Sequence, residues 1–192
     1  LLIWGHVSDS GEVLNLHFVT HTNWDQQLPG AFILETTLVL PVDFDETMVE
    51  LLQAVCLAAV LPQTVKKHQI RASALHKALD AAGTAFNNVP NNFSNREKSC
   101  LYLCYGNAIT ALSPRYDTNL FSQAKTQYQL ALENLEPNTA PIDWAQTKKH
   151  LASITHIEAE RSQDPGMLVE AKKELSEALI VHNKDRHGQA WA

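Results

Sequence analysis

Two features of this sequence recur at the same interval, and this repetition limits the folds that the chain can adopt. The segment SQAKTQYQLALEN (122–134) aligns with VEAKKELSEALIV (169–181). The alignment pairs Ala124 with Ala171, Tyr128 with Leu175 and Ala131 with Ala178, each pair 47 residues apart. The Trp-Ala pair of PIDWAQ, at Trp144, returns in HGQAWA at Trp191, again 47 residues later. Periods of roughly 20–50 residues are typical of solenoids built from stacked repeats.

The spacing inside each aligned segment describes a particular helix contact. Ala, a large residue four positions later and Ala three positions after that lie on one helix face. The small residues let a neighbouring helix approach, and the large residue fills the gap between them. This pattern resembles the second helix of a tetratricopeptide repeat (TPR). The first helix of that family carries a large residue and then a small one, as Leu151 and Ala152 do.

LCYG (103–106), in the preceding unit, fits the first helix of that family less well. Tyr105 stands where a small residue is expected, and Gly106 comes one place late. A one-residue shift, or a first repeat that caps the array, would explain the departure.

The breaks between helical stretches indicate two full repeats and the start of a third. Apolar residues at helical spacing predict helices over 95–112, 118–135, 142–161 and 166–183, joined by links that carry Pro or Gly. The phrase P-x-x-W-A at the head of a helix resembles a subfamily of bacterial TPR arrays with extended repeats. The resemblance implies antiparallel helix pairs stacked as a right-handed solenoid. We place the repeats at 95–140 and 141–186, with a third beginning at 187–192, and the period exceeds the usual ~34 residues.

Residues 1–40 alternate with period two instead, which predicts strands. In VLNLHFV (13–19), Leu14, Leu16 and Phe18 point to one side while Asn15 and His17 point to the other. LLIWGHV (1–7) forms a preceding strand across the turn SDSG, and AFILETTLVL (31–40) forms a third. A helix buried on both sides is predicted from Glu46, with Asp45 or Asp43 as its cap.

The predicted fold is therefore mostly α with an N-terminal α/β portion. We assign 1–62 to a partial α/β region, 63–94 to a linking or capping helix and 95–192 to the repeats. Three strands and one helix leave an exposed sheet edge and an uncovered face, which we expect a preceding segment or another chain to complete. WG-V at 4–7, VLNLHFV and the helix resemble the closing half of α/β domains that precede helical repeats in bacterial proteins. Examples are relatives of nucleotide cyclases and the amino-terminal domain of the Tol translocation protein.

Composition argues against several classes of protein. A formal net charge of −6 and scattered Lys pairs argue against nucleic-acid binding, which needs clustered Lys and Arg. The longest apolar run (48–62) is shorter than the ~20 residues of a membrane span and contains Glu50 and Gln53. Cys56, Cys100 and Cys104 form no even framework and are interpreted as buried thiols in a reducing, cytoplasmic protein. The start at Leu1, without an initiator Met or a signal peptide, suggests a fragment of a longer protein.

No constellation of residues predicts catalysis, a metal or a cofactor. The sequence has nine His but no His-Glu-x-x-His, Gly-x-Ser-x-Gly, phosphate-loop or dinucleotide motif. His150 and His156 are six apart on one predicted helix and so lie on different faces. We interpret the histidines as solvent-facing or capping residues, and the chain as not an enzyme.

The family resemblance implies a partner-binding groove lined by the first helices. With Leu151 packed inward, the residues that would face the groove are Tyr102, Lys149, Ser153 and His156. Trp144 is expected to wedge between repeats. We predict a protein–protein interaction or scaffold module for a protein or peptide partner, able to form a homo-oligomer through the sheet edge or the terminal repeat. The alternatives are a sensory or regulatory segment of a signalling enzyme whose catalytic domain lies outside this chain, and an unrecognised enzyme.

Overall fold

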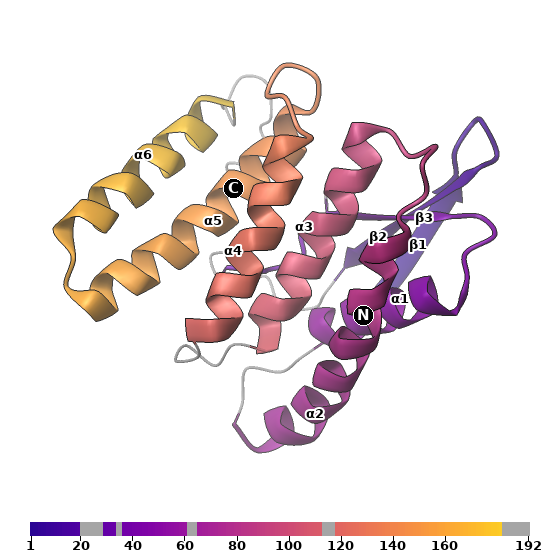
Figure 1. Ribbon diagram of the computed structural model, residues 1–192, viewed down its shortest axis with the longest axis horizontal. Coiled ribbons are helices and arrows are strands. Elements are labelled where there is room, and N and C mark those ends of the chain that lie inside the picture. Colours follow the sequence, from indigo (N-terminus) through magenta and orange to yellow (C-terminus); the bar gives the residue numbers. More distant parts are fainter. Residues whose placement is uncertain (20–28, 34–35, 61–64, 113–117, 182–192) are drawn as a thin grey trace.

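The computed structural model describes residues 1–19, 29–33, 36–60, 65–112 and 118–181 of the 192-residue chain. Trp191 and the predicted start of a third repeat lie outside this part. The described chain is mostly helical with a small antiparallel sheet near its N-terminus (Figure 1). This arrangement confirms the predicted class, a mostly α chain that begins with strands.

Three strands form the sheet in the order β1-β2-β3, with β1 at Leu2–Val7, β2 at Val13–Val19 and β3 at Thr37–Pro41. The register pairs Leu2 with Val19 across the first hairpin. The hairpin closes through Ser8, whose N–H donates to the Val13 carbonyl at 2.7 Å, and Gly11 takes a positive φ of 77° in the turn. The first two predicted strands are therefore confirmed.

The predicted third strand, 31–40, is wrong in its first half, because β3 begins only at Thr37. The backbone before it bonds elsewhere. The N–H of Ile33 donates to Thr36 Oγ1 at 3.1 Å, and the N–H of Thr36 donates to the Ile33 carbonyl at 2.9 Å. The N–H of Gly30 donates to His150 on a distant helix at 3.1 Å. Groups engaged in this way do not extend the ladder.

Two helices and a short 3₁₀ segment follow the sheet: α1 at Glu46–Ala59, α2 at Val65–Ala82 and η2 at Gly83–Asn88. Asp45 caps α1, since its Oδ1 accepts from the N–H groups of Thr47 at 3.0 Å and Met48 at 3.2 Å. That cap was one of the two predicted. Burial of α1 on both sides is not observed, because Val49 is 44% exposed.

Four further helices follow in order: α3 at Asn95–Leu112, α4 at Thr118–Glu133, α5 at Pro141–Ser162 and α6 at Pro165–Val181. They agree with the predicted helices to within a few residues at each end. Each helix packs against the next, so the four stand side by side in a row (Figure 1). The chain turns between α5 and α6 at Gln163, which has the left-handed φ of 54°.

One hydrophobic core runs from the sheet into the helical row. It joins Leu38 and Leu40 of β3 to Leu101 and Cys104 of α3, all of them buried. The Cys104 thiol donates to the Thr37 carbonyl at 3.4 Å, which links the same two elements. The expectation of an uncovered sheet face is therefore wrong for β3, because α3 of this chain covers it.

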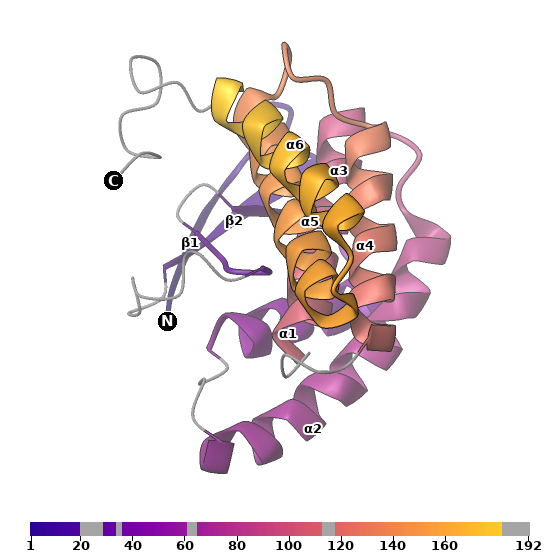
Figure 2. The same cartoon turned by 90° about the vertical axis from the view of Figure 1, so that its left-hand side faces the viewer.

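Strand β1 differs from the rest of the sheet, since each of its six residues is exposed. In the side view, β1 and β2 stand apart from the row of helices (Figure 2). The predicted exposed sheet edge is therefore present at β1.

Candidate functional site

The contact between α3 and α4 has the predicted small–large–small form. Ala124, Tyr128 and Ala131 of α4 are all 0% exposed. A Cβ atom added to Gly106 of α3 would lie only 2.7 Å from Cε1 of the Tyr128 ring. The small residue opposite Tyr128 is thus Gly106, one position after Tyr105.

The second helix pair differs at its large position. Ala171 and Ala178 of α6 are buried at 1% and 3% exposure, and Leu151 and Ala152 of α5 are also buried. Leu175, however, is 37% exposed, so the prediction that it fills a gap between helices is wrong. The physical reason is that no described element lies over that side of α6.

Leu175 belongs to an apolar stripe that we call the outer face of α6. It consists of Leu168, Leu175 and Leu179, with Lys172 between the first two on the same side of the helix. The three leucines are 40%, 37% and 56% exposed, and the neighbouring Ile180 is 77% exposed. Exposed apolar stripes of this kind mark interaction surfaces more often than isolated exposed leucines do.

The corresponding face of α4 shows what covers such a stripe within this chain. The residues 47 positions before Leu168 and Leu175 are Phe121 and Tyr128, which are 2% and 0% exposed. Helix α5 lies against this face and contributes Leu151 and Ile154 to the same core. Lys125, the counterpart of Lys172, places its Nζ 2.9 Å from Oε2 of Glu158 on α5.

An ion pair joins the first turns of α3 and α5. Arg96 Nε lies 2.7 Å from Asp143 Oδ2, and the two residues are 47 positions apart. The Asp143 side chain is 6% exposed and the Arg96 side chain 64%. The adjacent Trp144 is half-buried, with Lys148 Nζ 5.5 Å from its ring centroid. These contacts mark the start of α5 as a joint between the two helix pairs.

The four residues predicted to line a groove do not all face the same way. The Tyr102 ring stacks on Phe86 of η2 with a centroid distance of 5.3 Å, so it faces the α2 side of α3. Lys149 is half-buried, and this burial lowers the pKa of its ammonium group. Ser153 donates to the Lys149 carbonyl at 2.8 Å, whereas His156 is exposed and lies 3.7 Å from Glu160. The structure thus places Tyr102 apart from the three residues on α5.

A buried polar cluster that the sequence did not predict joins Gly30 and Thr36 to the helices. His150 accepts the Gly30 N–H through Nδ1 at 3.1 Å, and its ring stacks on Tyr128 at 5.6 Å. The Tyr128 hydroxyl donates to Asn107 Oδ1 at 2.9 Å. One turn before His150, Gln146 Oε1 accepts from Thr36 Oγ1 at 3.4 Å. Gly30 and Thr36 are thus bonded to α5, and the Tyr128 ring and hydroxyl link α5 to α4 and α3.

Burial fixes the charge state of His150. The ring is 2% exposed, and burial, followed by the nearby Lys149 charge, lowers its pKa to about 3. The interpretation of the histidines as solvent-facing or capping is therefore wrong for His150. Three buried nitrogens, His150 Nε2, Asn107 Nδ2 and Gln146 Nε2, have no hydrogen-bond partner among the described residues. The only local signal was that His150 precedes a predicted packing residue, Leu151.

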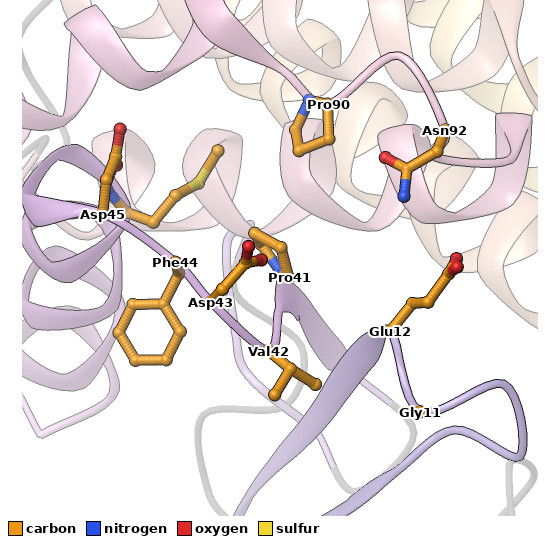
Figure 3. A pocket seen from close by; sticks show the side chains of 10 residues that line it. Gly11, Glu12, Pro41, Val42, Asp43, Phe44, Asp45, Pro90 and Asn92 are labelled. Carbon is orange, nitrogen blue, oxygen red and sulfur yellow. The ribbon is translucent and has the colours of Figure 1, made fainter.

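A hollow of about 640 Å³ opens beside the first hairpin. Figure 3 shows Glu12, Asp43 and Asn92 around it, with Pro90 above and the Phe44 ring turned away. Asp45 also lines the hollow, but its Oδ1 is engaged in capping α1. The hollow therefore offers an acidic rim and no buried polar group aimed into it from the residues that line it.

A metal site is not found in the part of the chain that the structure describes. No three His, Cys, Asp or Glu residues there are grouped as a metal site would require. Nor does any described helix combine the length and apolar character that crossing a membrane demands. No protein-family model, no curated protein and no solved structure matches this chain.

Proposed function

We propose that this chain is a protein–protein interaction or scaffold module and that the outer face of α6 binds an amphipathic helix of its partner. The observation that carries the proposal is the difference between two equivalent positions. Tyr128 on α4 is 0% exposed beneath α5, whereas Leu175 on α6 is 37% exposed. Removing such an apolar stripe from water favours association by roughly 25 cal/mol per Å².

The partner helix is defined by what α5 presents to α4. Leu151 and Ile154 are three residues apart, and Glu158 follows four residues later on the same helix face. A partner with two branched apolar residues and an acid at these spacings would cover the three leucines. Its acid would meet Lys172, as Glu158 meets Lys125 at 2.9 Å. Apolar burial would supply most of the affinity, and the ion pair would set the register.

This proposal treats α3–α4 and α5–α6 as two TPR-like units stacked as a right-handed solenoid. Three observations support it. The helix starts of α4 and α6, Thr118 and Pro165, keep the 47-residue interval of the sequence repeat. The Arg96–Asp143 pair joins positions at the same interval. Finally, α5 packs against both α4 and α6. In a solenoid each unit contacts its neighbours, and among the described residues no unit contacts the outer face of α6.

A helix-stabilised peptide with the sequence of residues 141–162 tests the proposal. Titrated into the 192-residue chain and followed by calorimetry, it should bind saturably. The chain variant Leu179→Lys should weaken this binding at least about tenfold, because a charge would then face the apolar side of the peptide. A matched peptide with Ile154→Asp should not bind. The variant Leu2→Lys, on β1, should leave the affinity unchanged.

Two outcomes would contradict the proposal: no saturable binding of the peptide, or binding that Leu179→Lys leaves intact. The sensory or regulatory alternative stays a prediction, since it requires a ligand or effector that no described feature selects.

A further inference from the structure

Strand β1 has the properties of a pairing edge. Among the described residues it pairs only with β2, and both of its faces are exposed. Its sequence, LIWGHV, contains no Lys, Asp, Glu, Arg or Pro. Natural sheets protect free edges with such charges, with Pro or with bulges, and a regular strand without them is a template for another strand.

The register decides which backbone groups the edge offers. The N–H of Ser8 donates to the Val13 carbonyl at 2.7 Å, which makes these two residues a hydrogen-bonded pair. Alternate residues of an antiparallel strand bond to the same neighbour, so Trp4 and His6 also bond toward β2. The N–H and C=O groups of the intervening residues point away from the sheet; these residues are Ile3, Gly5 and Val7.

The opposite side of β2 supports this assignment. The N–H of Val42 donates to the Glu12 carbonyl at 2.9 Å, so even-numbered residues of β2 bond toward β3. Odd-numbered residues of β2 are then left to bond toward β1, as the Ser8–Val13 pair requires.

We propose that β1 pairs antiparallel with β1 of a second copy of this chain, with Gly5 opposite Gly5 of that copy. In this register the three outward-facing residues of each strand oppose one another, so every outward N–H and C=O gains a partner. The result is a continuous six-stranded sheet. Sheets most often have about four to six strands, so this is a more usual size than three.

Side chains favour the same register on both faces. Ile3 lies opposite Val7 of the second copy, a branched apolar pair on the face beside Leu16. On the other face, Trp4 lies opposite His6 of the second copy. This extends a row of rings already present, in which His17 stacks on Trp4 at 5.2 Å and on His6 at 5.9 Å. No like charges meet across the pairing, because β1 carries neither acids nor Lys or Arg.

Gly5 fits the centre of this arrangement. A Cβ atom there would collide with the Asn15 carbonyl oxygen and lie 2.7 Å from Leu16 Cδ2. The position therefore excludes larger side chains. Two glycines opposite each other bring the two backbones together without side-chain obstruction.

Sedimentation equilibrium of the 192-residue chain tests the proposal. We expect a reversible monomer–dimer equilibrium. Val7→Pro removes an outward N–H, a change that edge strands tolerate when the N–H is otherwise unpaired, and should raise the dimer dissociation constant at least about tenfold. Val7→Thr, the matched control, keeps the N–H and the branched side chain and should still dimerise. Ile3→Lys, which places a charge on the edge, should also dissociate the dimer. If the proline variant does not fold, this variant tests the pairing instead.

Cross-linking tests the register. Trp4 and His6 of opposite copies form a non-hydrogen-bonded pair, the geometry in which side chains approach most closely. The double variant Trp4→Cys/His6→Cys should therefore give an oxidised covalent dimer, whereas Trp4→Cys alone should not. A chain that stays monomeric up to about 1 mM would overturn the proposal. So would a dimer that survives Val7→Pro and Ile3→Lys, above all one that Leu179→Lys dissociates through the outer face of α6.

Discussion

The two helix pairs share a sequence pattern, but the large residue of that pattern is buried in one pair and exposed in the other. In α3–α4, Tyr128 is fully buried against Gly106 and beneath α5. In α5–α6, Leu175 stands at the same place in the repeat and is 37% exposed. The small residues Ala124 and Ala171 are buried in both pairs. The difference indicates that contact within a pair is enough to bury the small residues. Full burial of the large residue also needs a neighbour on its other side, which α5 provides for Tyr128.

The largest expected effect contrasts these two large residues. Tyr128→Ala should lower the free energy of unfolding by about 3–5 kcal/mol, because it leaves a cavity in a closed core. It also removes the hydroxyl that donates to Asn107 at 2.9 Å. Leu175→Ala should cost about 1 kcal/mol or less, as partly exposed positions usually do. Urea denaturation of both variants measures the two losses of unfolding free energy. Similar losses would contradict the difference in packing between Tyr128 and Leu175.

A second prediction concerns pH, because α5, the first helix of the second pair, carries a buried histidine. The pKa of His150 is about 3 in the folded chain, below its ordinary value of 6.5. Between these values the unfolded chain binds a proton that the folded chain does not. Stability should therefore be fully present above about pH 6.5 and fall toward pH 3, with His150 contributing up to about 1.4 kcal/mol per pH unit.

His150→Gln isolates that contribution. The wild-type chain and this variant should diverge in the slope of unfolding free energy between about pH 6 and pH 4, with the variant less sensitive to acid. Ser153→Ala, on the same helix, changes no titratable group and should keep the wild-type slope. If His150→Gln also keeps it, His150 is not held neutral by the fold.

Local signals were sufficient to predict the helices. The helix predicted over 118–135 is observed at Thr118–Glu133, because its apolar spacing and the Pro residues of its links are properties of the segment itself. The strand predicted over 31–40 failed before Thr37 for the opposite reason. There Gly30 bonds to a histidine 120 residues away, and no local pattern encodes such a bond.

The candidate surface was predicted only in part. Repeat spacing identified the buried alanines correctly, yet it assigned Leu175 to a gap that no described helix encloses. Tyr102 was placed in a groove by analogy with Lys149, but η2 supplies Phe86, which holds the Tyr102 ring on another side. Exposure depends on which elements meet in space, and the repeat constrains only those within one pair.

A smaller effect is expected where the two pairs differ in the first helix. Gly106→Ala places a methyl group 2.7 Å from the Tyr128 ring, an overpacking that costs roughly 1–3 kcal/mol. The higher helix propensity of Ala offsets about 0.5–1 kcal/mol of this destabilisation. Ser153→Ala, 47 residues later, loses only a bond to its own helix and should change stability by no more than about 0.5 kcal/mol. Thermal unfolding resolves the difference, and a stabilising Gly106→Ala would mean that the α3–α4 contact is looser than described.

The smallest effect concerns the lysines that stand 47 residues apart. Lys125 Nζ lies 2.9 Å from Glu158 with both side chains largely buried, so Lys125→Met should cost about 1 kcal/mol. Lys172→Met should be close to neutral in the chain alone, since Lys172 is exposed. The difference in stability cost between the two variants should become smaller once the helical peptide of residues 141–162 is bound, because Lys172 can then pair with Glu158 of the peptide. If Lys172→Met lowers the affinity for the peptide, and added salt lowers the affinity of the wild-type chain in the same way, then Lys172 forms an ion pair with the peptide. The outer face of α6 would then bind a helix as α4 binds α5. Equal peptide affinity of the wild-type chain and Lys172→Met would confine this kind of ion pair to the contact between α4 and α5.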